Sequence, residues 1–230
     1  MNTAINTHSG WMRRAIETSS VSAVPFTHWQ FNQVFPQSIL DELVALPLNA
    51  PDVKYEKGTR EYNNSDRTYF NADTRAQFQV AGTVTEMFQA EETVSDIEKL
   101  CGINLDGSYL RIEYAQDKQG FWLEPHTDIR VKLFTMLVYL SCDPETADLG
   151  TDIYDHEKQL VRRMPFICNH ALVFVPGKNT WHGFEKRPIK GVRRTLIVNY
   201  VTNEWRDRFE LAYPDMPVRS RYSRTGGTRA

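Results

Sequence analysis

The chain has 230 residues, of which 41% are hydrophobic, and this content is enough to bury the core of one domain. Its 27 lysine and arginine residues nearly balance its 29 aspartate and glutamate residues. The resulting formal charge of -2 argues against a whole-chain attraction to nucleic acid or to an anionic membrane, so we expect a small molecule as the partner.

The two ends of the chain show no sustained hydrophobic period. Residues 1–24 contain no apolar core of the kind that a signal peptide needs, and no run of the sequence approaches transmembrane length. Residues 214–230 are rich in arginine, serine and glycine. We expect both segments to be flexible, with a single domain over 25–213, a cytoplasmic location and no membrane partner.

Helical patterns are confined to the first half of the sequence. Leu40, Leu43 and Val44 would form the apolar face of a short helix that Ser38 could cap. A longer helical stretch is predicted over 74–101, with a break near 90–93 and its end at Gly102.

Residues 51–71, between these helical regions, are polar and aromatic without a clear period. Long irregular segments in compact domains are often lids or binding loops. We therefore expect this segment to order over the site when the substrate binds, although a static surface loop fits the sequence equally well.

The second half of the sequence changes to short runs rich in Val, Ile, Leu, Tyr and Thr. These predicted strands lie at 109–114, 132–140, 151–154, 171–175 and 193–201. Their spacing, with Gly and Pro between them, is typical of a sandwich or barrel. Pro176 and Gly177 suit the central positions of a type II turn, which would fold the preceding strand straight back toward Trp181 and His182.

The three cysteines, Cys101, Cys142 and Cys168, are odd in number and widely spaced. This pattern fits neither a disulfide framework nor a CxxC metal site. We expect reduced thiols, at least two of them buried as ordinary core residues.

A candidate metal site begins with His126 and Asp128. The two residues are two apart, so both side chains leave the same face of an extended segment, and Pro125 favours extended geometry before it. His182 is the natural third ligand. Two histidines and one carboxylate form the facial triad of non-haem Fe(II) oxygenases. An HxD motif alone is weak evidence, since a surface loop explains it about as well.

A candidate carboxylate site follows on the strand at 193–201. With a period of two, Arg193 and Thr195 share one face of this strand while Arg194 lies on the other. A guanidinium and a hydroxyl on one face can bind a carboxylate through a charge-assisted pair and one further hydrogen bond. The alternative is that both arginines are exposed strand charges.

The order of these motifs resembles that of the 2-oxoglutarate- and Fe(II)-dependent oxygenase superfamily: HxD, a histidine about fifty residues later, then GxRxT on a β-branched strand. The short interval between Asp128 and His182, and the sequence FTHWQFNQVF at 26–35, are closest to its prolyl 4-hydroxylase-like branch. The resemblance covers roughly 26–204. It implies a mostly β fold with flanking α-helices, the double-stranded β-helix, which is a cupin-like jelly roll.

The resemblance also implies roles for particular residues. His126, Asp128 and His182 match the iron ligands, and Arg193 with Thr195 matches the pair that holds the distal carboxylate of 2-oxoglutarate. The implied activity is a dioxygenase that uses Fe(II), 2-oxoglutarate and O2 to hydroxylate an unactivated C–H bond of a small or amino-acid-like molecule, with release of succinate and CO2.

Two further residues are candidates for the cosubstrate, and others for the substrate. Tyr114 stands where the family often supplies a tyrosine hydroxyl, although a core tyrosine is equally compatible with the sequence. Lys132 could reach the cosubstrate or point outward from its strand. The candidate substrate contacts are the polar and aromatic residues near the irregular segment and the metal motif: Arg67, Tyr69, Asn71, Trp122, Arg130, Tyr154 and Trp181.

Other function classes remain open at this point. Asn199 stands six positions beyond Arg193, where the nucleic-acid demethylases of the superfamily carry an arginine, so we expect no nucleic-acid partner. A cupin-like metalloenzyme of another reaction class, such as a metal hydrolase or isomerase, would bind its substrate directly through Arg193. A non-catalytic barrel would hold the metal structurally or as a sensor, although structural zinc usually takes four protein ligands.

Overall fold

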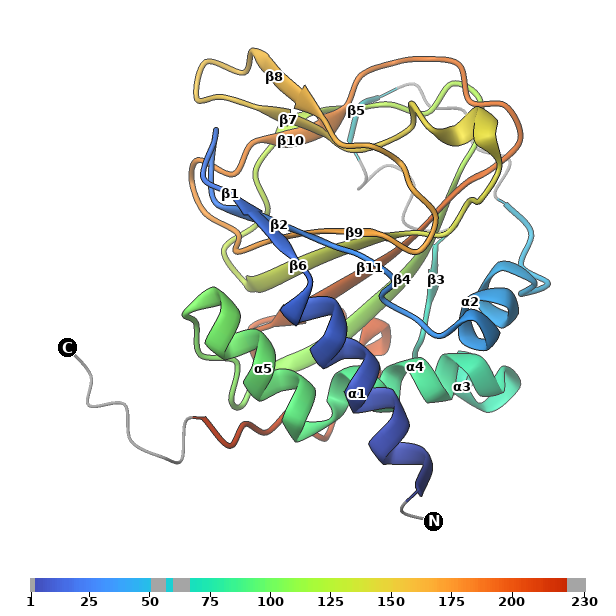
Figure 1. Ribbon diagram of the computed structural model, residues 1–230, viewed down its shortest axis with the longest axis vertical. Coiled ribbons are helices and arrows are strands. Elements are labelled where there is room, and N and C mark those ends of the chain that lie inside the picture. The colour runs from blue at the N-terminus through green and yellow to red at the C-terminus, as the bar shows by residue number, and fades with distance from the viewer. Residues whose placement is uncertain (1–2, 51–56, 60–66, 223–230) are drawn as a thin grey trace.

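The computed structural model describes residues 3–50, 57–59 and 67–222, with the side chains of 3–9 left out. Most of the predicted lid at 51–71 therefore lies outside the described residues. Two antiparallel sheets are stacked in layers, and the helices cover the outer face of the larger sheet (Figure 1). This arrangement is a double-stranded β-helix with flanking helices, which confirms the predicted fold class.

The larger sheet has seven strands and the smaller has four. In spatial order the larger sheet contains β1 (Ser20–Ser22), β2 (His28–Phe31), β9 (Ala171–Phe174), β6 (Lys132–Tyr139), β11 (Arg193–Val201), β4 (Tyr109–Asp117) and β3 (Thr68–Tyr69). The smaller sheet contains β5 (Leu123–His126), β10 (His182–Phe184), β7 (Asp152–Tyr154) and β8 (Leu160–Arg163). All five strands that the β-branched runs predicted are present.

The helices are α1 (Thr3–Glu17), α2 (Gln37–Val44), α3 (Ala72–Gln77), α4 (Gln79–Gln89) and α5 (Glu91–Cys101). The predicted break near residue 90 is confirmed at Ala90, and Gly102 ends α5 in the left-handed region with a φ of +67°. A second break at Phe78 was not predicted. The cap of α2 was predicted wrongly, because Pro36 occupies the N-cap position and Ser38 lies inside the helix.

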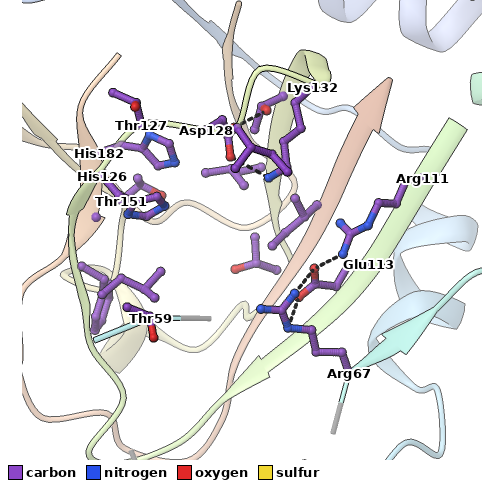
Figure 2. A pocket seen from close by; sticks show the side chains of 18 of the residues that line it. Thr59, Arg67, Arg111, Glu113, His126, Thr127, Asp128, Lys132, Thr151 and His182 are labelled. Atoms are coloured by element: carbon purple, nitrogen blue, oxygen red, sulfur yellow. Dashed lines mark hydrogen bonds and ion pairs between the residues drawn. The ribbon is translucent and has the colours of Figure 1, made fainter. Parts of the chain in front are cut away.

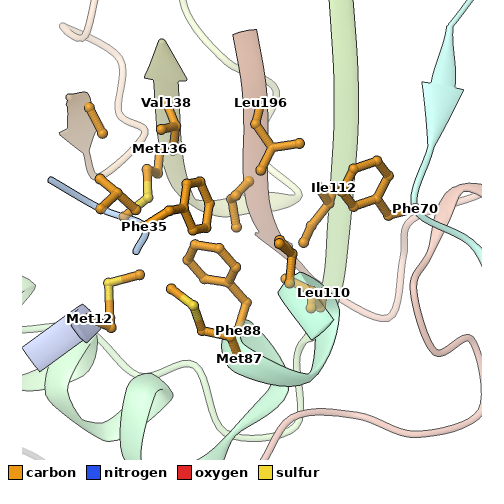
Figure 3. Close-up of a cluster of buried hydrophobic side chains, with 14 of the residues drawn as sticks. Met12, Phe35, Phe70, Met87, Phe88, Leu110, Ile112, Met136, Val138 and Leu196 are labelled. Carbon is orange, nitrogen blue, oxygen red and sulfur yellow. The ribbon is translucent and has the colours of Figure 1, made fainter. Parts of the chain in front are cut away.

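Two hydrophobic cores lie on opposite faces of the larger sheet, and the alternation along β11 separates them. Leu196, Val198 and Tyr200 belong to the core beneath the helices, where Phe35 and Phe88 also pack (Figure 3). Ile197 belongs to the core between the two sheets. The predicted strand phase is therefore correct, and it directs Arg193 and Thr195 into the space between the sheets.

The ends of the chain are more ordered than the sequence suggested. Residues expected to be flexible form α1, whose Met12 and Ala15 are buried against the core beneath the helices. The apolar positions 12, 15 and 16 have helical spacing, which the adjacent arginines obscure. Val218 and Ser220 are also buried, and the backbone of Val218 is hydrogen-bonded to that of Ser108. The flexible assignment is therefore wrong for these parts of both ends.

Cys142 and Cys168 form a disulfide, so the expectation of three reduced thiols is wrong. The two residues are 26 positions apart in sequence but lie just beyond the paired ends of β6 and β9, with their Cα atoms 4.7 Å apart. Sequence spacing alone does not reveal this pairing of strand ends. Cys101 remains free, and burial raises the pKa of its thiol to about 12.

The strand after Pro176 and Gly177 does not fold back as a hairpin. β9 pairs with β2 and β6, while β10 pairs with β5 and β7 in the other sheet. Both edges of β9 are already occupied, so the chain crosses from one sheet to the other. The predicted hairpin is wrong, but the crossing carries His182 to the side of His126.

We found no helix in the described part of the chain with the length and apolar character to cross a bilayer. The cytoplasmic location and the division of the chain into domains stay predictions.

Candidate active site

The two histidines of the predicted metal site face each other from neighbouring strands. His126 on β5 is the direct partner of His182 on β10, and their ring centroids are 4.4 Å apart. The Nδ1 atom of His126 lies 2.7 Å from the carbonyl oxygen of Glu124, and that of His182 lies 2.9 Å from the carbonyl oxygen of Thr180. A carbonyl only accepts, so each Nδ1 carries the proton and each Nε2 is left as the basic nitrogen. Metal-binding histidines commonly have this arrangement.

Asp128 lies near this pair, and both of its carboxylate oxygens have partners. Lys132 Nζ donates to Oδ1 at 2.6 Å and Thr135 Oγ1 donates to Oδ2 at 2.7 Å. Burial alone would raise the pKa of Asp128, but the Lys132 ammonium group and the hydrogen bond from the Thr135 hydroxyl hold that pKa well below its usual range. The carboxylate is therefore ionised at neutral pH, as a metal ligand must be.

Within 3–50, 57–59 and 67–222, no three His, Cys, Asp or Glu side chains form a group close enough to hold a metal. The structure brings His126 and His182 together, whereas Asp128 is turned toward Lys132 (Figure 2). Lys132 itself binds Asp128, so its expected contact with a cosubstrate stays a prediction.

Arg193 and Thr195 lie in the wall of one cavity together with the histidines. Arg193 is only 3% exposed, and its Nε donates to the carbonyl oxygen of Leu149 at 2.7 Å while its Nη1 contacts Asp117 Oδ2 at 2.6 Å. Its guanidinium also lies 4.8 Å from the centroid of the Phe184 ring. The alternative of two exposed strand arginines is therefore wrong for Arg193, and Arg194 lies on the other face.

Thr195 is 1% exposed, and its hydroxyl has no hydrogen-bond partner in the described part of the chain. Leaving a buried hydroxyl unpaired costs roughly 1–3 kcal/mol. Such an atom in a cavity wall commonly marks a position that a ligand or water fills.

Tyr114 does not reach the cavity. It packs in the core beneath the helices, where its ring stacks on Phe70 and its hydroxyl donates to the carbonyl oxygen of Leu43 at 2.9 Å. The expected contact with the cosubstrate is wrong because Tyr114 has the opposite phase on β4 from the cavity-facing Arg111 and Glu113.

The cavity has a volume of about 710 Å³ and its lining comes from both sheets. Opposite the histidine pair, Arg67, Arg111 and Glu113 form the facing wall (Figure 2). Glu210 joins them through a 2.5 Å contact with Arg111 Nε. These four residues are called the ionic wall below.

The seven candidate substrate residues have different positions. Arg67 lines the cavity, and Tyr69 packs on Arg111, with 4.7 Å between the guanidinium carbon and the ring centroid. Asn71 caps α3 by accepting a hydrogen bond from Thr74. The remaining four residues do not line the cavity: Trp122, Arg130, Tyr154 and Trp181.

Sequence reasoning missed most of the ionic wall. Arg111, Glu113 and Asp117 share a phase on β4, so a period-two reading of the charged positions would have placed them on one face. Glu210 is 99 positions from Arg111, and no local pattern predicts their contact. Trp205, which also lines the cavity, follows the last strand without any motif.

Solved structures share this fold at low sequence identity. A prolyl 4-hydroxylase from Pseudomonas putida matches with a TM-score of 0.53 and 14% identity, over 83% of this chain and 94% of that chain. A prolyl hydroxylase from Trichoplax adhaerens, in complex with a peptide fragment of the hypoxia inducible factor oxygen degradation domain, matches with a TM-score of 0.52 and 15% identity. The match covers 87% of this chain and 91% of that chain. A prolyl 4-hydroxylase from Phytophthora capsici matches with a TM-score of 0.55 and 12% identity, over 86% of this chain and 65% of that chain.

No protein-family model and no curated protein sequence matches the chain. The order of the strands, the stacking of the two sheets and these three matches agree with one another. The chain therefore has the double-stranded β-helix fold of the prolyl 4-hydroxylases.

Proposed function

We propose that this protein is a 2-oxoglutarate- and Fe(II)-dependent dioxygenase that hydroxylates a small, amino-acid-like molecule. The observation that carries the proposal is the pair of Arg193 and Thr195 in the same cavity as His126 and His182. The Thr195 hydroxyl is buried without a partner in the described residues, beside a buried guanidinium. Such a pair suits a dianionic 2-oxo acid whose other end chelates a metal.

The donor types suit iron once Asp128 turns from Lys132 toward the histidine pair. His126 and His182 would supply two neutral imidazoles, and Asp128 would supply one carboxylate, which together make the ligand set of non-haem Fe(II) oxygenases. Each carboxylate oxygen of Asp128 has two lone pairs, so it can bind a metal while keeping one of its present contacts. When bound, the iron would supply the activation of O2 for hydroxylation with 2-oxoglutarate as the electron source.

The chain's own residues perform binding and orientation. The carbonyl groups of Glu124 and Thr180 fix the tautomer and the ring direction of the two histidines. Asp117 and the Leu149 carbonyl hold the guanidinium of Arg193 in one orientation, so the distal carboxylate of a bound 2-oxo acid meets a preformed partner. Phe184 covers the guanidinium face and excludes water from it.

Binding of 2-oxo acids tests the proposal. In the absence of O2, the Fe(II)-loaded protein should bind 2-oxoglutarate more tightly than 2-oxobutanoate, which can chelate a metal but lacks the distal carboxylate. The expected difference is roughly tenfold to a hundredfold, the effect of one charge-assisted contact of about 1.5–3 kcal/mol. Equal affinities in calorimetric titrations would contradict the assignment of Arg193 and Thr195 to the distal carboxylate.

A further inference from the structure

We infer that the ionic wall binds the amino and carboxyl groups of a free α-amino acid, inserted between Arg67 and Glu113. The inference rests on the proposed function and names the class of its substrate. The ionic wall faces the histidine pair across the cavity, so a molecule bound there would present its side chain toward the candidate iron site (Figure 2).

Arg111 is the fixed part of the ionic wall. Its Nε contacts Glu210 at 2.5 Å, its Nη1 donates to Asn199 Oδ1 at 3.2 Å and its Nη2 donates to Glu113 Oε2 at 3.1 Å. Tyr69 and Trp205 cover its guanidinium, with ring centroids 4.7 and 4.9 Å away. All three nitrogens are engaged, so Arg111 positions the carboxylates and is not the group that binds a ligand.

Arg67 is held much less tightly. Its Nε and Nη1 each lie 3.5 Å from an oxygen of Glu113, whereas charge-assisted hydrogen bonds to carboxylates are usually about 2.7–2.9 Å. Its side chain is 13% exposed, compared with 3% for Arg111. Arg67 can therefore turn to a ligand carboxylate and gain shorter contacts than the ones it gives up.

The charge of the ionic wall selects the kind of ligand. Two arginines and two glutamates give it no net formal charge. An added monoanion would leave one buried charge uncompensated, which is costly, whereas a zwitterion leaves the sum unchanged. With an α-amino acid in place, Arg67 exchanges Glu113 for the ligand carboxylate, and Glu113 exchanges Arg67 for the ligand ammonium group.

One hydrogen-bonding group beside the ionic wall points to the same ligand. Trp205 lines the cavity, and its indole N–H is buried without a hydrogen-bond partner among the described residues. The indole only donates, so a ligand rich in acceptors, such as a carboxylate, would satisfy it.

A peptide would not satisfy the ionic wall in the same way. An internal residue carries neither charge, a peptide N-terminus brings only the ammonium group, and a C-terminus brings only the carboxylate. Ligand charge alone therefore distinguishes a free amino acid from a protein or peptide substrate at the ionic wall.

The test is a set of calorimetric titrations without O2, each carried out with and without Fe(II) and 2-oxoglutarate. The probes are the proteinogenic L-amino acids, followed by the N-acetyl and carboxamide derivatives of every amino acid that binds. We expect at least one free amino acid to bind. Its N-acetyl and carboxamide derivatives should bind with an affinity lower by roughly tenfold or more, because each lacks one charge-assisted contact. Absence of binding by all free amino acids, or equal binding of the blocked forms, would overturn the inference.

Variants sharpen the test. Arg67→Gln should lower the affinity for the free amino acid by roughly tenfold or more and leave the affinity for the carboxamide nearly unchanged, because only the free amino acid has a carboxylate for Arg67. Trp205→Phe keeps an aromatic ring and removes the N–H, and it should lower the affinity for the free amino acid several-fold. Arg162→Gln, at an exposed arginine on β8, is the matched control and should bind like the wild type. Unchanged affinity in both Arg67→Gln and Trp205→Phe would also overturn the inference.

The outcomes separate this inference from the proposed function. A protein that binds 2-oxoglutarate with iron but no free amino acid retains the proposed function and loses the inference. A protein that binds a free amino acid through Arg67 but not 2-oxoglutarate does the reverse.

Discussion

Asp117 and Arg193 form a buried ion pair, with 2.6 Å between Oδ2 and Nη1, that joins β4 to β11 at the cavity. Their side chains are 6% and 4% exposed. The pair compensates the charge of Arg193 in the protein alone and leaves only part of the guanidinium for a ligand. Asp117 thus acts on the cavity by positioning Arg193.

Removal of Asp117 should destabilise the fold. Asp117→Ala leaves the buried guanidinium without its partner, and we expect the free energy of unfolding to fall by about 3–5 kcal/mol. Asp117→Asn keeps an acceptor for Arg193 and should cost less. Urea denaturation measures both variants, and an Ala variant as stable as the wild type would show that the pair contributes little.

Thr195→Val should have opposite effects on stability and on binding. The variant removes a buried, unpaired hydroxyl, so the protein without ligand should be as stable as the wild type or more stable by about 1 kcal/mol. Its affinity for 2-oxoglutarate should fall roughly threefold to tenfold, because the distal carboxylate loses one hydrogen bond. Thermal denaturation and calorimetry give the two quantities. A destabilised variant with unchanged affinity would show that the Thr195 hydroxyl stabilises the folded protein and does not bind 2-oxoglutarate.

The two neighbouring arginines of β11, Arg193 and Arg194, should contribute differently to the binding of 2-oxoglutarate. Arg193→Gln should lower the affinity for 2-oxoglutarate roughly tenfold to a hundredfold. Arg194→Gln should have little effect on this affinity, because Arg194 lies on the other face of the strand. Circular dichroism should first establish that both variants are folded. Equal losses of affinity would indicate that the site depends on net charge rather than on the cavity face.

The thiol count tests the described disulfide. Unfolded without a reductant, the protein should expose one thiol, that of Cys101, and after reduction it should expose three. In the folded protein at pH 8 this thiol should react slowly, because burial raises its pKa from 9.0 to about 12 and little thiolate forms. Three reactive thiols before reduction would restore the expectation drawn from the sequence.

The sequence predicted the parts of the molecule that depend on local periodicity. The phase of β11 is visible because apolar and polar residues alternate along one uninterrupted run, and this phase alone separates Arg193 from Arg194. The same rule applied to β4 predicts that Tyr114 points away from the cavity, whereas the family resemblance implied a contact with the cosubstrate. His126 of the HxD motif lies beside His182, as the order of the motifs indicated, whereas the binding of a metal by this motif stays a prediction.

The parts that were not predicted depend on contacts between distant segments. The disulfide needs the ends of β6 and β9 to meet, and the crossing at Pro176 depends on β9 already having two neighbours. Arg111 and Glu210 meet across 99 positions. None of these relationships has a local signal, because each is set by the packing of the whole sheet.

We propose that the two histidines hold Fe(II) together with 2-oxoglutarate, and such a complex has a characteristic absorption spectrum in the absence of O2. Addition of Fe(II) and 2-oxoglutarate without O2 should produce the weak visible charge-transfer band of a metal-bound 2-oxo acid. The band should persist in His156→Ala, at an exposed histidine, and disappear in His126→Ala and His182→Ala. Absence of the band in the wild-type protein, or its persistence in both histidine-pair variants, would show that His126 and His182 do not hold the iron.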